Sequence, residues 1–367
     1  MSCDFMALAT PGVQGLHPYE AGKPVEELER ELGIGNIIKL ASNENPLGPS
    51  EKALAAACEA MADGTRYPDS NGFRLKAALQ HHYGLAPDQL TLGNGSNDVL
   101  ELIARAFLRP DDEVIFSQYA FAVYPIVTQG SSARAVVTPA RDYGHDLQAM
   151  SGAITDRTRL IFIANPNNPT GTALMRDELV AFLTSVPERV VVVLDEAYTE
   201  YVQNGEFPDG LELLPRFPNL IVTRTFSKAW GLAGLRVGFA AASEVITDLL
   251  NRVRQPFNVS IPALAAAEVI LDDADYLARS IEVNRQGMRQ LEEGLRELGV
   301  GYIPSFGNFI TADVARPAQP VFQALLHEGV IVRPLGGYQM PQHLRISVGL
   351  PEENDRFLRA LKQVLAC

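Results

Sequence analysis

Three polar side chains follow short apolar segments of strand type in this sequence. The segment at 159–165 (RLIFIAN) leads into NPNNPTG, which contains Asn168. In the same way, RVVVVL leads into Asp195, and LIVTRTF leads into Ser227 and Lys228. Ligands of open α/β sheets bind outside the carboxyl ends of the strands. We therefore expect Asn168, Asp195 and Lys228 to meet at one rim of a sheet.

These residue types fit the chemistry of a pyridine aldehyde. A carboxylate opposite a ring nitrogen keeps that nitrogen protonated, so that the ring can accept electrons. A lysine amine can condense with an aldehyde and later act as the base that moves a carbon-bound proton. The amide of Asn168 and the phenol of Tyr198 can form hydrogen bonds with a ring hydroxyl.

A candidate anion site accompanies them. The turn at 93–97 (GNGSN) opens a helix, where free backbone N–H groups and the helix dipole favour an anion. Thr225, Ser227 and Arg236 add hydroxyls and a positive charge, and Arg236 follows Lys228 by eight positions (236 − 228). The turn could equally be a plain strand-to-helix connection, since Gly and Asn are common there.

The elements that must position these groups alternate between helix and strand. Val99, Leu100, Ile103 and Phe107 have helical spacing, and short β-branched segments lie at 113–117, 133–139, 159–165, 189–197 and 220–227. Several are continuously apolar, as in a parallel sheet buried on both faces. We predict an α/β fold: a large domain with a mostly parallel sheet between helices (41–255), a smaller α+β domain (256–367), and an N-terminal arm (1–40) that packs with the small domain.

The composition of the chain limits the kinds of partner that the protein can bind. The 367 residues carry a net charge of −13, which argues against nucleic acid but leaves room for an anionic small molecule beside a local arginine cluster. Cys3, Cys58 and Cys367 are scattered and predict neither a disulfide framework nor a metal site. We see no signal peptide and no apolar run of about 18 residues, so we expect a cytoplasmic protein without membrane contact.

The motifs NPNNPTG, DEAY, SKAWGLAGLRVG and HLRISVG occur in this order. With them the sequence resembles the fold-type I pyridoxal-phosphate-dependent aminotransferases over essentially its whole length. A closer resemblance is to the histidinol-phosphate aminotransferases, and it rests on the segments at 15–33, 37–50, 65–72, 119–126 and 329–354.

The resemblance implies pyridoxal 5'-phosphate bound covalently to Lys228, the catalytic residue. It implies that Asp195 pairs with the pyridine nitrogen, that Asn168 and Tyr198 contact the ring hydroxyl, and that Tyr119 stacks on the ring. Tyr124 is assigned to packing alone. The other cofactor residues implied by the resemblance are Gly95, Ser96, Asn97, Thr225, Ser227 and Arg236.

On the substrate side, the resemblance implies that Arg345 binds an anionic group and that Tyr19, Asn45 and Arg333 lie nearby. It also implies that Tyr67 reaches the cofactor of a neighbouring subunit, in a homodimer with shared active sites. Simpler roles are possible for three of the candidate residues. Asp195 could cap the helix that follows it, and Arg333 and Arg345 could be surface charges.

The expected reaction is transamination between histidinol phosphate and a 2-oxo acid, with 2-oxoglutarate as the expected acceptor, in histidine biosynthesis. Two related activities stay open at this point, those of an aromatic amino acid aminotransferase and of a threonine-phosphate decarboxylase. A rival from another class is a regulator that binds pyridoxal phosphate without turnover.

Overall fold

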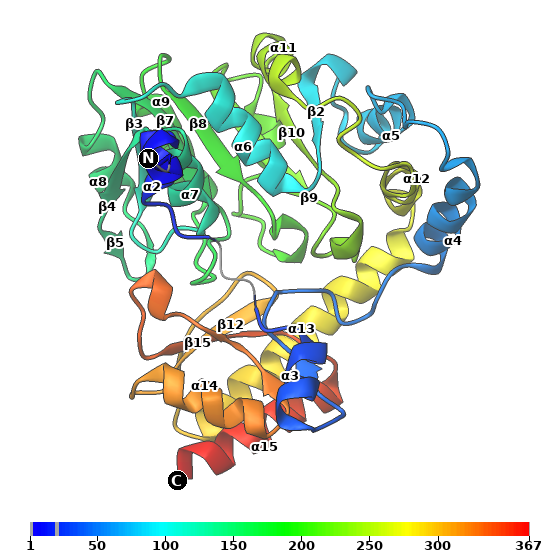
Figure 1. Ribbon diagram of the computed structural model, residues 1–367, viewed down its shortest axis with the longest axis vertical. Coiled ribbons are helices and arrows are strands. Elements are labelled where there is room, and N and C mark those ends of the chain that lie inside the picture. Colours follow the sequence, from blue (N-terminus) through cyan, green and yellow to red (C-terminus); the bar gives the residue numbers. More distant parts are fainter. Residues whose placement is uncertain (1–2, 19–21, 367) are drawn as a thin grey trace.

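A sheet of seven strands forms the centre of the larger of two lobes in the computed structural model, which describes residues 3–18 and 22–366 (Figure 1). Strand β10 is antiparallel to both of its neighbours, whereas the pairs from β9 to β4 are all parallel. The predicted mostly parallel sheet is therefore confirmed. In spatial order the strands are β2 (Leu90–Gly93), β10 (Gly238–Ala242), β9 (Leu220–Thr225), β8 (Val191–Asp195), β7 (Thr158–Ala164), β3 (Glu113–Ser117) and β4 (Arg134–Thr138).

Both faces of this sheet are buried. Alternate side chains of a strand point to opposite faces, so that one strand contributes to two apolar clusters. In β8, Val192 and Leu194 belong to one apolar cluster, and Val191 and Val193 belong to another. Residues of α4 (Glu51–Ala60), α5 (Phe73–Tyr83), α9 (Arg176–Ser185) and α12 (Ile261–Ile270) complete the first cluster. Residues of α6 (Ser96–Phe107), α7 (Val123–Gly130) and α11 (Glu244–Val253) complete the second.

The smaller lobe is built on a four-stranded antiparallel sheet. The long helix α13 (Ala274–Glu297) runs into it from the larger lobe (Figure 1). The sheet order is β11 (Gly301–Ile303), β12 (Phe309–Asp313), β15 (His343–Ser347) and β14 (Arg333–Pro334), with α14 (Ala318–His327) and α15 (Pro351–Ala366) packed in the same core.

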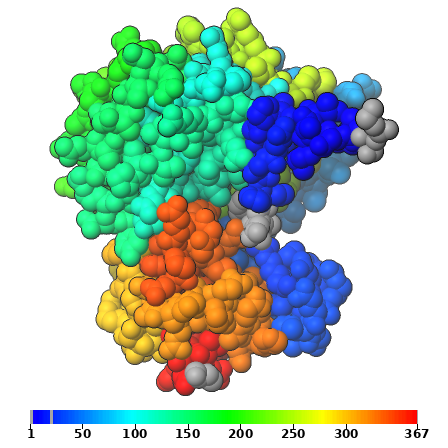
Figure 2. Space-filling view, turned by 60° about the vertical axis from the view of Figure 1, so that its left-hand side comes forward, coloured from blue at the N-terminus to red at the C-terminus, as the bar shows by residue number. Residues whose placement is uncertain are grey.

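The segment predicted as an N-terminal arm contacts both lobes. Helix α3 (Val25–Leu32) packs through Leu28 in the smaller lobe, where β1 (Ile38–Lys39) pairs with β13 (Val330–Ile331). Before it, α1 (Phe5–Leu8) and α2 (Pro11–Gln14) lie on the larger lobe, shown in dark blue in Figure 2. The backbone N–H of Gly12 donates there to Ser132 Oγ at 3.0 Å.

Short elements complete the chain. The hairpin strands β5 (Ala140–Arg141) and β6 (Gly144–His145) precede α8 (Leu147–Gly152), and α10 (Gly210–Leu213) precedes β9. The 3₁₀ helices are η1 (Met61–Asp63), η2 (Pro87–Gln89), η3 (Thr199–Tyr201), η4 (Ala233–Leu235) and η5 (Gly336–Tyr338).

Gly238 lies where β10 packs closely against the start of α6. A Cβ at this position would lie 2.7 Å from the backbone N of Ser96 and 2.9 Å from the carbonyl O of Arg224. We expect Gly238→Ala to lower the free energy of unfolding by about 1–3 kcal/mol, because backbone atoms cannot move aside as a side chain can. Urea denaturation measures the change. Gly234→Ala is the matched control, since a Cβ there meets nothing within 4 Å, and an equal loss in both variants would contradict the explanation.

Candidate active site

A cavity lies where the carboxyl ends of β7, β8 and β9 and the start of α6 face the smaller lobe. The sheet therefore brings Asn168, Asp195 and Lys228 to one site, in the arrangement that their positions at strand ends predict. The polar and aromatic residues that line the cavity are Ser42, Asn43, Ser96, Asn97, Phe121, Asn168, Asp195, Tyr198, Thr225, Ser227, Lys228, Arg236, Arg333 and Arg345.

Asp195 is a buried carboxylate held at both oxygens. Tyr124 Oη donates to Oδ2 and Thr223 Oγ1 donates to Oδ1, each at 2.9 Å. The pKa of Asp195 is raised, because burial outweighs the lowering effects of these two hydrogen bonds and of the charge of Lys228. The two donors fix the plane of the carboxylate at the cavity. Tyr124, predicted only as a packing residue, thus contacts a candidate functional group directly.

Lys228 has an amine suited to nucleophilic and base chemistry. Burial, together with the nearby charges of Arg345 and Arg236 and against the raising effect of Glu44, lowers its pKa from 10.5 to about 7. A substantial fraction of the amine is therefore unprotonated near neutral pH. Its Nζ donates to the carbonyl oxygen of Ser42 at 2.9 Å, which orients the side chain.

Tyr198 presents a hydroxyl whose neighbours act as donors. Asn43 Nδ2 and Asn168 Nδ2 donate to its oxygen at 3.0 and 3.1 Å. Burial raises the pKa of Tyr198 to about 12, so the phenol keeps its proton. Because the oxygen already accepts two hydrogen bonds, the O–H is left to donate to an oxygen in the cavity.

Arg345 reaches the site from β15 of the smaller lobe. Its Nη1 donates to Asn168 Oδ1 at 2.6 Å, and its Nη2 donates to the carbonyl of Ala41 at 2.7 Å. Within the described part of the chain its buried Nε has no acceptor. A buried guanidinium N–H without a partner is unfavourable, and an anion in the cavity would satisfy it.

The start of α6 and Arg236 form a second anion site. Gly95 caps the helix with φ of 80°, and a Cβ there would lie 2.3 Å from an Nη atom of Arg236. Only glycine lets the guanidinium lie this close to the helix N-terminus. Arg236, itself in the left-handed region at φ of 53°, donates through Nη1 to Ser227 Oγ at 3.2 Å. Two positive ends meet here, as a phosphate requires.

The remaining geometry fits a phosphorylated pyridine aldehyde. The cavity offers a carboxylate for a ring nitrogen, a phenol donor for a ring hydroxyl, an amine for an aldehyde and a positive helix end for a phosphate. These are the four recognition groups of pyridoxal 5'-phosphate.

Two predicted site residues, Tyr119 and Asn45, lie beside the cavity, and in each case a residue two positions away lines it. Tyr119 packs next to the cluster of Ile303, Leu335 and Met340, 5.7 Å from the ring of Tyr143, whereas Phe121 lines the cavity. Asn45 Nδ2 donates to Ala229 O and Ser280 Oγ, whereas Asn43 lines the cavity. The structure thus adds Phe121 and Asn43 to the cavity wall, and the roles of Tyr119 and Asn45 toward cofactor and substrate stay predictions.

Two further predictions fall elsewhere. Tyr67 lies on the surface with 81% of its side chain exposed, and its ring stacks on that of Phe257 at 4.6 Å. Tyr19 lies outside the described residues. Arg333 lines the cavity, and its position on β14 is directly opposite Arg345 on β15.

Across residues 3–18 and 22–366, no group of three or more His, Cys, Asp or Glu side chains is arranged to hold a metal ion. Over the same residues, no helix has the length and apolar character needed to cross a membrane.

Comparison with known proteins identifies the family of this chain. The family model "Aminotransferase class I and II" matches residues 35–361. Histidinol-phosphate aminotransferase 2 of Pseudomonas fluorescens strain Pf-5 is 61% identical over 368 residues, covering all of both chains. The enzyme of the same name from Pseudomonas aeruginosa is 61% identical over 99% of both chains. The crystal structure of histidinol-phosphate aminotransferase from Sinorhizobium meliloti in complex with pyridoxal-5'-phosphate has a TM-score of 0.91 and 30% identity, covering 98% of this chain and 97% of the other.

Fold and site thus define a pyridoxal-phosphate-dependent aminotransferase of fold type I. The chain belongs to the class I and II aminotransferase family and, within it, to the histidinol-phosphate aminotransferases. The resemblance stated from the motifs is confirmed.

The lowered pKa of Lys228 predicts how the protein without cofactor captures pyridoxal phosphate. Below the pKa the amine is protonated and cannot attack an aldehyde, so the capture rate should rise with pH and level off above a midpoint near 7. An exposed lysine would give a midpoint at about 10.4. Stopped-flow absorbance of the lysine-bound cofactor measures the rate, with Lys228→Ala as the control that should give no signal. A midpoint above roughly 9 would show that burial does not control this amine.

Proposed function

We propose that Lys228 binds pyridoxal 5'-phosphate covalently and that the chain transfers an amino group between histidinol phosphate and a 2-oxo acid, with 2-oxoglutarate as the acceptor, in histidine biosynthesis. One observation carries the proposal: an amine of lowered pKa, a held carboxylate and two opposed arginines line one cavity. The similarity to histidinol-phosphate aminotransferases over the full chain supports the substrate. We also propose a cytoplasmic location, as for a biosynthetic enzyme.

Within this proposal each cavity residue has a role toward the cofactor. Asp195 pairs with the ring nitrogen, Tyr198 and Asn168 contact the ring hydroxyl, and Tyr119 stacks on the ring, with Phe121 at the cavity wall. When bound, the cofactor supplies a protonated ring that accepts the electron pair released at the substrate carbon. The residues that hold its phosphate are Gly95, Ser96, Asn97, Thr225, Ser227 and Arg236.

Lys228 moves the proton in this reaction. With a substrate amine in place, the free Nζ would act as the base that takes the proton from the amine-bearing carbon of the substrate and as the acid that returns it. The carbonyl of Ser42 orients Nζ through the hydrogen bond at 2.9 Å. Asp195, held by Tyr124 and Thr223, keeps its negative charge near the ring nitrogen while electron density arrives there.

The two opposed arginines explain an anionic substrate. Arg333 and Arg345 are directly paired across β14 and β15, a placement in which like charges repel. An anion between them relieves the repulsion, and the planar guanidinium of Arg345 suits both a phosphate and a carboxylate. The site can then accept histidinol phosphate in one half of the reaction and glutamate in the other.

A half-reaction titration tests the substrate. Histidinol phosphate, phenylalanine and tyrosine are each added to the cofactor-loaded protein, and the loss of visible cofactor absorbance is followed. We expect histidinol phosphate to react at the lowest concentration. Arg345→Ala should lower kcat/KM for it about 10- to 100-fold, the effect of losing a charged hydrogen bond.

The control for that titration is Arg316→Ala, which removes an exposed arginine of the smaller lobe. Unimpaired half-reactions of Arg345→Ala with both histidinol phosphate and glutamate would refute the anion assignment. A clear preference for phenylalanine or tyrosine would favour an aromatic amino acid aminotransferase.

We further propose a homodimer in which Tyr67 completes the cofactor site of the partner subunit. Tyr67 is too exposed to serve its own cavity, and its stacking on Phe257 fixes the ring in an outward position. A large exposed aromatic pair of this kind is typical of a protein interface.

Hybrid dimers test the shared site. Lys228→Ala and Tyr67→Ala subunits, each nearly inactive alone, are unfolded together and refolded. Random pairing makes half of the dimers hybrids, and each hybrid holds one intact site, so about a quarter of the parent activity should return. Activity no higher than the mean of the two separate variants would rule out shared sites.

A further inference from the structure

A buried ion pair lies on the reverse side of the sheet from the cavity, one residue beyond Asp195 and beyond its hydrogen-bond donor Thr223. Glu196 directly follows Asp195, the last residue of β8, and Arg224 follows Thr223 within β9. Arg224 Nε and Nη2 both donate to Glu196 Oε2, at 3.0 and 2.7 Å. The two side chains are 5% and 0% exposed, so the pair is shielded from water.

Strand alternation places this pair opposite the cofactor residues. Leu194 and Val222, two residues before Glu196 and Arg224, belong to the apolar cluster on the face away from α6. Val193 and Ile221, two residues before Asp195 and Thr223, belong to the cluster on the α6 face. Each strand therefore directs one polar residue to the α6 face of the sheet and the next residue to the reverse side.

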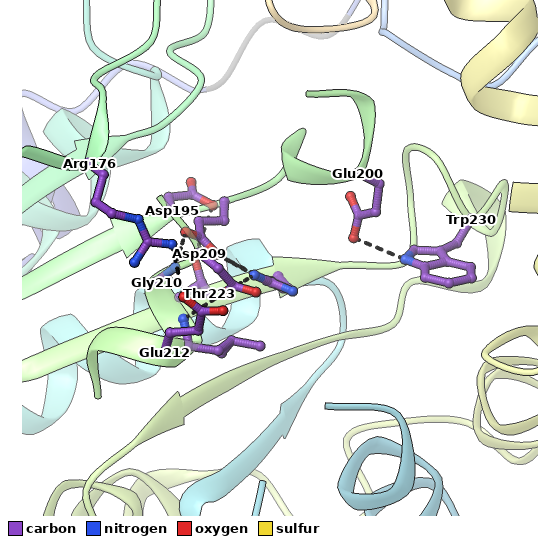
Figure 3. A network of polar contacts seen from close by, with 11 residues as sticks. Arg176, Asp195, Glu200, Asp209, Gly210, Glu212, Thr223 and Trp230 are labelled. Carbon is purple, nitrogen blue, oxygen red and sulfur yellow. Dashed lines mark hydrogen bonds and ion pairs between the residues drawn. The ribbon is translucent and has the colours of Figure 1, made fainter. Parts of the chain in front are cut away.

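The pair is also fixed from behind by a short turn. The backbone N–H of Gly210 donates to Glu196 Oε1 at 2.8 Å, and Asp209 Oδ1 accepts from Arg224 Nη2 at 2.6 Å. A Cβ on Gly210 would lie 2.7 Å from that Glu196 oxygen, so glycine allows the approach. Figure 3 shows the polar network that contains Asp195, Asp209, Gly210 and Thr223.

This pair continues the link between the strands where backbone pairing stops. The last backbone hydrogen bond joins Glu196 N to the carbonyl of Thr223 at 2.9 Å. Beyond it, β8 leads to Tyr198 and β9 leads through Thr225 and Ser227 to Lys228. Buried ion pairs contribute little net stability compared with apolar residues of similar volume, so a positional role accounts better for the pair.

We propose that Glu196 and Arg224 are positioning residues for amino transfer, which fix the ends of β8 and β9 and through them the carboxylate of Asp195 and the hydroxyl of Thr225. The inference rests on the proposed function, because the benefit of a fixed Asp195 is realised only with a cofactor in the cavity. A displacement of even 1 Å at such a group can lower a rate about 10²-fold.

The test compares the double variant Glu196→Leu/Arg224→Met with the parent protein, both loaded with pyridoxal phosphate. Three quantities are measured: the melting temperature, the first half-reaction with histidinol phosphate normalised to bound cofactor, and the pH dependence of the cofactor absorbance. The matched control is Arg176→Ala/Glu212→Ala, which removes an exposed ion pair of 2.9 Å from the same side of the sheet (Figure 3).

We expect the double variant to keep a melting temperature close to that of the parent and to bind the cofactor on Lys228. Its limiting half-reaction rate should fall about 10- to 100-fold with little change in the substrate concentration at half-maximal rate. The pH at which the absorbance changes should shift, because Asp195 no longer holds the ring nitrogen in place. The control should match the parent in all three measurements.

Glu196→Gln keeps the test decisive if the double variant does not fold. This change keeps the acceptor for Gly210 N–H and removes the charge that faces Arg224, so the rate should fall and the absorbance profile should shift in the same direction. A folded variant with the parent's rate and pH profile would overturn the proposal. Failure of the parent protein to bind the cofactor on Lys228 would instead overturn the proposed function.

Discussion

The rest of the site depends on one constraint: the buried carboxylate of Asp195 must be able to carry its charge. Burial of Asp195 at the end of β8 favours its neutral form. Hydrogen bonds from Tyr124 and Thr223 and the positive charge of Lys228 act against this effect. The carboxylate needs these neighbours in fixed positions, which the parallel strands β8 and β9 and helix α7 provide. A surface carboxylate would be charged without such support, but water would weaken its field at a ring nitrogen.

The same constraint connects the two lobes. Tyr198 follows Asp195 by three residues and accepts hydrogen bonds from Asn43 and Asn168, and Asn168 in turn accepts from Arg345 of the smaller lobe. Movement of the smaller lobe would therefore disturb the phenol beside the carboxylate. The arginines also act on Lys228, since the positive charge of Arg345 helps to lower its pKa. In the proposed reaction, substrate recognition and amine reactivity thus share one residue.

Much of this arrangement follows from the sequence, because it depends on strand order and strand ends. The apolar segments at 113–117 and 159–165 were predicted as strands and correspond to β3 and β7. Strands β2 and β10 were not predicted, since LTLG and GFAAA are short and rich in small residues, and tertiary pairing determines them. Which of Tyr119 and Phe121 faces the cavity depends on the turn before α7, which residue types alone do not specify. The contact of Tyr124 with Asp195 spans 71 residues, and helical spacing carries no signal for it.

Charge distribution explains how a protein of net charge −13 presents a cavity for anions. Four of its cations, Lys228, Arg236, Arg333 and Arg345, line this one cavity, and the neighbouring low-dielectric walls concentrate their field. The cations are not equivalent, since Arg236 lies beside the start of α6 and the arginines at 333 and 345 lie on paired strands of the other lobe. A cofactor phosphate and a substrate phosphate would therefore occupy opposite ends of the cavity. The larger lobe supplies the anion site at Arg236, and the smaller lobe supplies the one at Arg333 and Arg345. In the proposed reaction, this separation would let Lys228 serve two substrates in turn without competition from the cofactor's own phosphate.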